Sequence, residues 1–146
     1  MKLNLGCGKS WREYQGYEGV DNVDFGQKYI LDLAIDGLKG IDDNSVDHII
    51  AFNILEHIPQ ERVIFVMNEC NRVLKSKCEL HIKVPPVTNP LQAFSDPTHR
   101  SYWSYVTFNN YFCGKSPRNA DYGIKKWGKR KVKTISPGEL EAILYK

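Results

Sequence analysis

Two glycines near the start of the chain and one acid downstream have the spacing of a nucleotide-binding site. Gly6 and Gly8 follow a short apolar run that begins almost at the first residue. Glycine lets the backbone turn sharply and approach a ligand with no Cβ in the way. Asp24 ends the strand-like run 19–24, about 20 positions after the turn, where an acid accepts the hydroxyls of an adenosine ribose. A glycine pair alone equally fits an ordinary tight turn, so the order of the elements carries this prediction.

The turn also limits which nucleotide can bind. Lys9 and Ser10 stand where the dinucleotide fingerprint has its third glycine. The Gly-Lys-Ser/Thr ending that holds a triphosphate is absent as well. An adenosine without a phosphate chain fits what remains, and this indicates S-adenosylmethionine as the cofactor.

A second group of chemically capable side chains lies at residues 96–103, Asp-Pro-Thr-His-Arg-Ser-Tyr-Trp. This stretch belongs to a long aromatic-rich insertion, residues 87–121, beyond the carboxyl end of a strand, where ligands of such sheets bind. His99 is the candidate general base, because an imidazole titrates near neutral pH. The residues expected to contact the methyl acceptor are Asp96, Arg100, Tyr102 and Trp103. The alternative is that Asp96 and His99 only brace the loop.

No metal site is expected. The four cysteines form no Cys-x-x-Cys pair, which argues against structural zinc and disulfides and favours a reducing cytoplasm. The other conceivable ligands have no ligand spacing along the sequence. They are Glu56, His57, Asp96 and His99.

The elements that must position these residues read as an alternating α/β pattern. After the first strand, further strands are predicted at 19–24, 29–33, 46–52 and 78–84. A helix is predicted after Pro59, with one apolar stripe at helical spacing. Its members are Val63, Val66, Met67, Cys70, Val73 and Leu74. A short helix is predicted around residues 104–112.

The carboxyl-terminal segment admits two structures. Residues 136–139, Ser-Pro-Gly-Glu, fit the start of a terminal helix or the turn of a hairpin. Apolar residues alternate on both sides of this turn, which favours the hairpin. They include Val132, Leu140, Ala142 and Leu144.

Composition suits one domain over residues 1–146, with 42% hydrophobic and 25% charged residues. The net charge of +3 is too small to indicate nucleic-acid binding by itself. No apolar run is long enough for a membrane span, and a strand at the first residues leaves no place for a signal peptide. The basic run 125–133 could bind nucleic acid, but a solvated edge strand is the preferred interpretation.

The ordered motifs resemble class I S-adenosylmethionine-dependent methyltransferases, and most closely a small branch of bacterial and phage enzymes. The motifs are residues 3–8, Asp24, residues 43–47 and residues 52–57. The resemblance covers nearly the whole chain and is weak after Asn119. It implies a Rossmann-like open twisted sheet, mostly parallel, with an antiparallel C-terminal hairpin and helices on both faces.

The resemblance also implies a set of cofactor contacts. The residues at the matching positions are Asn4, Gly6, Cys7, Gly8, Asp24, Asp32, Leu33 and Asn53. Asp32 would contact the exocyclic amine of adenine, although it could instead cap a following turn. Asn4 departs from the family pattern, because an acid is common there, and so does Lys9. The sequence Asn53-Ile54-Leu55-Glu56 lacks the Asn/Asp-Pro-Pro-Tyr/Phe pattern and argues against a DNA adenine methyltransferase.

Three functions are therefore considered. The first is methyl transfer to a hydroxyl or amine of a small molecule or sugar. The second is binding of S-adenosylmethionine without transfer, and the third is RNA methylation through the basic run. Because a sulfonium is already a good leaving group, the enzyme mainly aligns the reactants, which can supply about 7–11 kcal/mol. We expect the first function.

Overall fold

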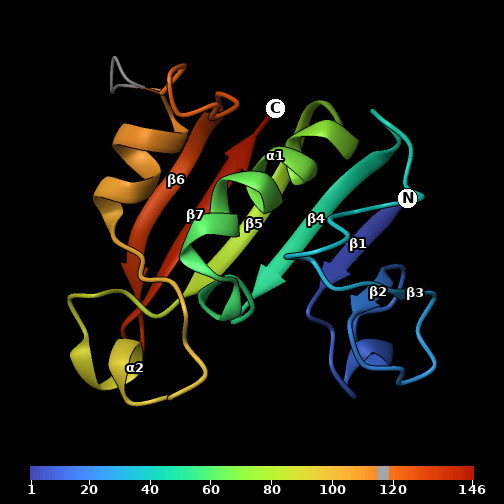
Figure 1. The fold of residues 1–146 in the computed structure, drawn as a ribbon, viewed down its shortest axis with the longest axis horizontal. Coiled ribbons are helices and arrows are strands. Elements are labelled where there is room, and N and C mark those ends of the chain that lie inside the picture. Colours follow the sequence, from blue (N-terminus) through green and yellow to red (C-terminus); the bar gives the residue numbers. More distant parts are fainter. Residues whose placement is uncertain (115–118) are drawn as a thin grey trace.

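The computed structural model, which describes residues 1–114 and 119–146, contains one seven-stranded sheet of order β3-β2-β1-β4-β5-β7-β6 (Figure 1). The strands are β1 (Lys2–Leu5), β2 (Glu18–Asp21), β3 (Tyr29–Ile30), β4 (Val46–Phe52), β5 (Leu74–Val84), β6 (Gly128–Ile135) and β7 (Glu139–Tyr145). Strands β1 to β5 pair in parallel, and β7 runs antiparallel to both β5 and β6. The predicted hairpin is therefore confirmed.

The helical segments are short except for α1 (Val63–Val73), and they connect or flank the strands. The others are η1 (Trp11–Glu13), η2 (Leu55–His57), η3 (Gln60–Arg62), α2 (Pro90–Phe94) and the π-helix η4 (Thr107–Phe112). Among the described residues, no helix is long and apolar enough to cross a membrane.

Helix α1 forms where the sequence places its apolar stripe. Five members of the stripe are confirmed, because Val63, Val66, Met67, Cys70 and Val73 are all buried in α1. The sixth, Leu74, instead begins β5. They pack against the inward-facing side chains of the central strands in one hydrophobic core. Figure 1 shows α1 in front of β5, on one face of the sheet.

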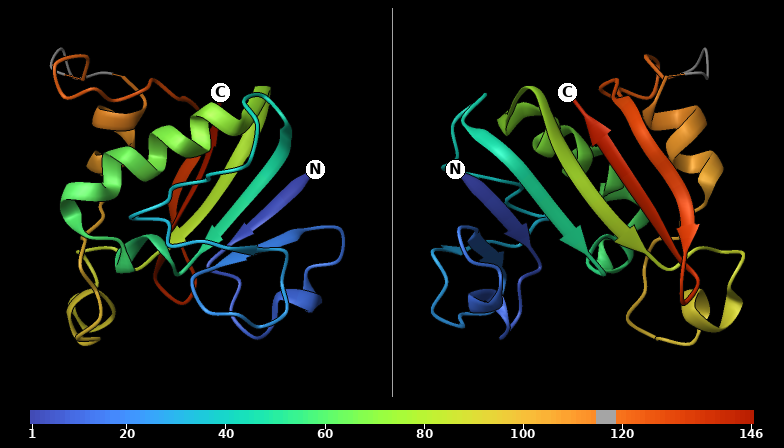
Figure 2. Two further views of the ribbon diagram at one scale, coloured as in Figure 1. Left: turned by 45° about the vertical axis from the view of Figure 1, so that its right-hand side comes forward. Right: turned by 180° about the vertical axis from the view of Figure 1, so that it is seen from behind.

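The other face of the sheet carries much less helix. Tyr14 and Tyr17, which follow η1, contact Phe52 and His48 of β4 edge to face, at ring distances of 6.4 Å and 5.8 Å. These β4 residues alternate with the core residues of the same strand, so η1 lies opposite α1. Figure 2, seen from behind, shows β4, β5 and β7 in front of α1. The predicted α/β fold with helices on both faces is thus confirmed, with η1 as the small second layer.

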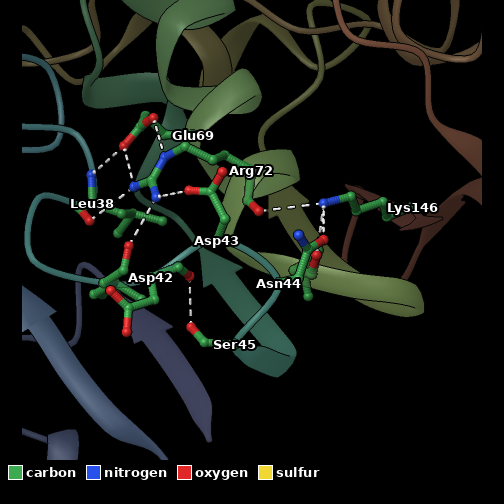
Figure 3. A network of polar contacts seen from close by, with 10 residues as sticks. Leu38, Asp42, Asp43, Asn44, Ser45, Glu69, Arg72 and Lys146 are labelled. Carbon is green, nitrogen blue, oxygen red and sulfur yellow. Dashed lines mark hydrogen bonds and ion pairs between the residues drawn. The ribbon is translucent and has the colours of Figure 1, made fainter.

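The carboxyl end of α1 is tied to the segment that precedes β4 (Figure 3). Arg72 donates to both oxygens of Glu69, at 2.7 Å and 2.8 Å, and to Asp43 at 2.6 Å. It also donates to the carbonyl oxygens of Leu38 and Ile41. One guanidinium therefore holds helix and connection together, which fixes the approach of the chain to β4.

Three predicted strand boundaries were wrong. Strand β2 ends at Asp21 rather than Asp24, because Asp21 Oδ1 accepts the backbone N–H of Val23 and starts a turn. Strand β3 ends at Ile30 rather than residue 33, because the chain turns at Asp32. Strand β5 begins at Leu74 rather than residue 78, and an irregularity in its pairing with β4 absorbs the extra residues.

Candidate active site

The glycine turn adopts the conformation that its residue types require. Gly6 has φ +62° and Gly8 has φ +54°, a left-handed region that other residues avoid. A Cβ on Gly6 would lie 2.5 Å from the side chain of Ile54. The amide of Gly6 donates to Val20 at 2.8 Å, and the amide of Gly8 donates to Asp21 Oδ2 at 2.9 Å. The turn is therefore fastened to the end of β2.

A pocket of about 340 Å³ opens beside this turn, at the carboxyl ends of the first strands. Its volume lies in the range of small-molecule sites. Residues of the turn, of the ends of β2 and β3 and of the connection after β4 line it, and we call it the cofactor pocket. They include Gly6, Asp21, Asp32, Leu33, Ile54 and His57. Three of the predicted cofactor residues, Gly6, Asp32 and Leu33, are therefore gathered at one pocket.

Asp24 does not join them, so its predicted place at the end of the second strand is corrected to Asp21. Asp24 is exposed, and its Oδ1 accepts the N–H of Gly26 in a turn beyond the strand. Asp21 is the acid that ends β2 and lines the cofactor pocket. The sequence offered two acids three positions apart, and the shorter strand selects the first.

Asp32 caps the following turn, as one of the two alternatives held, and it also lies at the cofactor pocket. Its side chain lines the cofactor pocket. Its Oδ1 also accepts the N–H groups of Ala34 and Ile35, at 2.8 Å and 3.3 Å, and so caps the following turn. Because each carboxylate oxygen offers about two acceptor sites, capping leaves capacity for a ligand.

Asn4 and Cys7 are buried on either side of the start of the turn. Burial, and secondly the carboxylate of Asp21, raise the pKa of the Cys7 thiol. A protonated buried thiol is a packing group rather than a nucleophile. Asn53 has φ +52°, and its side chain donates to Glu139 Oε1 at 3.2 Å. It lines a second pocket rather than the cofactor pocket.

The second pocket, of about 700 Å³, is more open and lies between the end of β4 and the insertion. Most of its lining residues have polar or charged side chains, and we call it the acceptor pocket. It includes Asn53, Glu56, Gln92, Asp96, His99 and Glu139. His57 lines this pocket and the cofactor pocket. The two pockets therefore meet at one side chain.

The insertion is fastened to this junction through the short helix η2. The N–H groups of Arg100 and Ser101 both donate to the carbonyl oxygen of Glu56, at 2.7 Å and 3.0 Å. Asp96 Oδ1 accepts the N–H and the hydroxyl of Thr98, and these bonds lower the pKa of Asp96. Asp96 thus braces the loop, as the alternative interpretation held. It also lines the acceptor pocket.

The residues predicted to contact the acceptor lie in different places. Arg100 lines the cofactor pocket. Tyr102 is 46% exposed, and its ring contacts that of Phe94. It lines neither the cofactor pocket nor the acceptor pocket. The prediction for Trp103 was wrong, because its side chain is 1% exposed in the core, where it stacks on Phe108. Its indole N–H donates to Ser101 Oγ, so no part of the ring is left for a ligand.

Glu56, which the sequence analysis named only as a rejected metal ligand, is a functional candidate in the structure. The residue is 2% exposed, and Oε2 has no hydrogen-bond partner among residues 1–114 and 119–146. Burial raises the pKa of this carboxyl group to about 7. Such a perturbed acid in a cleft is typical of functional sites.

The fold also brings Glu56 together with two histidines. One ligating atom of Glu56, one of His57 and one of His99 all lie within 4.8 Å of one another. The sequence argument against metal ligands, which rested on spacing, was therefore wrong about proximity. His99 comes from the insertion, more than 40 positions away, so local spacing could not reveal the cluster.

Comparison with known proteins agrees with this geometry. Residues 22–82 match the family described as "Methyltransferase domain". No curated protein compared with the chain matches it.

Solved structures of methyltransferases share the fold. A SAM-dependent methyltransferase from Archaeoglobus fulgidus is 18% identical, with a TM-score of 0.69. The match covers 99% of this chain and 85% of the Archaeoglobus chain. The Burkholderia thailandensis 1,6-didemethyltoxoflavin-N1-methyltransferase, solved with bound 1,6-didemethyltoxoflavin and S-adenosylhomocysteine, is 14% identical with a TM-score of 0.65. The match covers 99% of this chain and 70% of that one. A SAM-dependent methyltransferase from Aquifex aeolicus is 13% identical with a TM-score of 0.62, over 98% and 80%. Residues 22–82 thus match a methyltransferase domain, and nearly the whole chain shares the fold of these SAM-dependent methyltransferases.

Proposed function

We propose that the chain transfers the methyl group of S-adenosylmethionine to a hydroxyl or amine of a small molecule or sugar. The observation that carries this proposal is the meeting of two pockets at His57. A methyl donor in one pocket and an acceptor in the other would have their reacting atoms face each other at that residue. Methyl transfer needs such alignment above all, and alignment can supply about 7–11 kcal/mol of the barrier.

The cofactor pocket suits an adenosine. Asp21 stands at the end of β2, where a carboxylate can accept the ribose hydroxyls. Asp32 lines the wall beyond it and is placed to accept from an adenine amine. The left-handed turn at Gly6 and Gly8 lets the rest of the ligand approach the backbone.

The acceptor pocket favours a neutral or cationic polar molecule over a nucleic acid. Glu56, Asp96 and Glu139 are among its lining residues, and their carboxyl groups disfavour a phosphate backbone. Amide and imidazole groups beside them can hydrogen-bond hydroxyls and amines.

The basic run does not strengthen the RNA alternative. It lies largely on β6, the edge strand at the far end of the sheet from β1. Arg130 pairs with Glu79, and Lys131 pairs with Glu141. Part of its charge is thus neutralised within the protein, and lysines also protect an edge strand from pairing.

The test is a transfer assay with S-adenosylmethionine labelled in its methyl group. The protein is incubated with fractionated cell extracts, and the labelled product is identified. We expect S-adenosylhomocysteine to form only when an acceptor fraction is present, with the label on a small polar molecule. Intact cofactor binding without transfer to any fraction would support the binding-only alternative, and label in RNA would support the third function.

A further inference from the structure

We propose that Glu56, His57 and His99 form a binding site for one divalent transition-metal ion of the zinc type, at the junction of the two pockets. The three side chains come from two separate segments, η2 and the insertion. Their ligating atoms lie within 4.8 Å of one another. The imidazole rings of the histidines are 4.9 Å apart and nearly perpendicular. This convergence is held by the backbone, because Arg100 and Ser101 both donate to the carbonyl of Glu56.

The hydrogen bonds of His99 leave one nitrogen ready for a metal. Nδ1 lies 2.9 Å from the carbonyl oxygen of Ala93. A carbonyl oxygen can only accept, so Nδ1 carries a proton. In the neutral ring Nε2 then has a free lone pair, and it lies 3.7 Å from Asp96 Oδ2, beyond hydrogen-bond distance. At metal sites a ligand histidine is usually fixed in this way, with its Nδ1–H donating to a backbone carbonyl.

His57 repeats the same arrangement. Its Nδ1 lies 3.3 Å from the carbonyl oxygen and 3.1 Å from the hydroxyl of Thr98. The Thr98 hydroxyl donates in turn to Asp96 Oδ1 at 2.6 Å, so it accepts from His57. The proton is therefore on Nδ1 in this ring as well, and Nε2 is left with a lone pair.

Glu56 supplies the negative charge. Its Oε2 is buried and has no hydrogen-bond partner in the part of the chain that the structure describes. This is costly for a polar atom unless something compensates. A cation next to this oxygen would remove that cost. The unpartnered acid and two histidines oriented by carbonyl groups are separate observations, and both indicate the same ligand.

The donor set selects the kind of ion. Two imidazole nitrogens and one carboxylate oxygen suit Zn²⁺, whereas Mg²⁺ and Ca²⁺ prefer oxygen ligands. Three protein ligands leave a coordination position open, as in catalytic zinc sites. Zinc bonds of about 2.0–2.2 Å require the three side chains to draw closer together than they are here.

The chemical role of the ion rests on the proposed function. An acceptor hydroxyl bound at the open position loses its proton to water, because a bound cation lowers the pKa of such a group. The oxygen then uses a lone pair to form a bond to the methyl carbon while the carbon–sulfur bond breaks. The products are the methyl ether and S-adenosylhomocysteine. In this scheme His99 holds the ion and is not the general base.

The test measures metal binding directly. The full chain is stripped with a chelator and titrated with Co²⁺, whose visible absorption reports inner-sphere ligands, and then with Zn²⁺ in competition. We expect one equivalent of each ion to bind, with Mg²⁺ unable to compete. Glu56→Gln and His99→Ala should each weaken Co²⁺ binding by about tenfold or more, and Thr98→Val by about tenfold through its support of His57.

Matched controls separate a site from general surface binding. Glu139→Gln removes a carboxylate that lines the acceptor pocket but is not one of the three proposed ligands. His81→Ala removes a histidine of β5 that lines neither pocket. Both should bind Co²⁺ like the wild type. Absence of saturable binding by the wild type, or equal binding by Glu56→Gln and His99→Ala in folded form, would overturn the proposal. Thermal melting of every variant, with and without Zn²⁺, shows whether it is folded.

Binding of S-adenosylhomocysteine is measured on the same samples. If the nucleoside binds and Co²⁺ does not, the metal site is wrong and the proposed function stands. If Co²⁺ binds at these residues and the nucleoside does not, the proposed function fails while the site stands. The two inferences are therefore tested separately.

Discussion

The backbone N–H of Gly8 donates to Asp21 Oδ2 across 2.9 Å, joining the glycine turn after β1 to the acid that ends β2. The second oxygen of Asp21 accepts the N–H of Val23. The carboxylate is thus held in place before any ligand arrives. A preorganised acid of this kind loses little conformational freedom when it binds a ribose.

We expect Asp21→Ala to weaken binding of S-adenosylhomocysteine by about ten- to a hundredfold, since a hydrogen bond to a charged group contributes about 1.5–3 kcal/mol. Asp24→Ala is the matched control and should bind almost like the wild type, because Asp24 is exposed and bonded to Gly26. Calorimetric titration of S-adenosylhomocysteine into both variants measures the two affinities. The assignment to Asp21 is wrong if Asp24→Ala is the weaker binder.

The two glycines of the turn predict different costs for alanine. Both have positive φ, so either substitution should destabilise the fold by about 1–2 kcal/mol. Gly6→Ala should cost more and also impair cofactor binding, because its Cβ would meet Ile54 at 2.5 Å. At Gly8 the same Cβ meets nothing within 4 Å. Urea unfolding compares the two variants, and equal losses of stability would show that contact with Ile54 is unimportant.

Asp32 should recognise the adenine base. Replacing the exocyclic amine of the ligand by oxygen removes the donor that Asp32 would accept. The affinity of the wild type should therefore fall by about tenfold or more, and that of Asp32→Ala should change little. This double comparison separates base recognition from capping, because capping of Ala34 is lost with either ligand. Parallel losses in both proteins would assign Asp32 to the turn alone.

Arg72 should stabilise the fold in a pH-dependent way. It lowers the pKa of Glu69, so the charged carboxylate is favoured in the folded state. That contribution is complete above the unfolded pKa near 4.3 and is lost as the pH falls through the lower folded value. Arg72→Leu should cost about 1–3 kcal/mol at pH 7, and less below about pH 4.

Chemical unfolding at several pH values measures this effect. Arg72→Lys keeps the charge but cannot donate to both oxygens of Glu69 in a fork. Its free energy of unfolding should therefore lie between those of the wild type and Arg72→Leu. A cost for Arg72→Leu that does not change between pH 7 and pH 3 would mean that packing, and not the ion pair, carries the effect.

The sequence predicted those parts of the fold that follow from local pattern. The stripe from Val63 to Val73 and the alternation around residues 136–139 needed only hydrophobic periodicity. The end of β2 needed knowledge of its neighbour. Strand β1 ends at Leu5, and its pairing with β2 ends at Val20, so the acid that follows is Asp21. Nothing in the run 19–24 by itself marks that point.

The acceptor side could not be read in the same way. The insertion has no periodicity, so burial of Trp103 beside Phe108 was hidden among other aromatic residues. The proximity of Glu56 and His99 depends on two backbone hydrogen bonds from the insertion to η2. Such bonds involve groups that every residue carries, and the side-chain types therefore give no sign of them.

Calorimetric titration of S-adenosylmethionine and S-adenosylhomocysteine into the wild-type chain tests the central claim most directly. The geometry of the cofactor pocket predicts one site per chain for both nucleosides, weakened by Asp21→Ala. It also predicts much weaker binding of NAD, because the turn lacks the third glycine for a pyrophosphate. Failure of both nucleosides to bind, or tighter binding of NAD, would contradict the account.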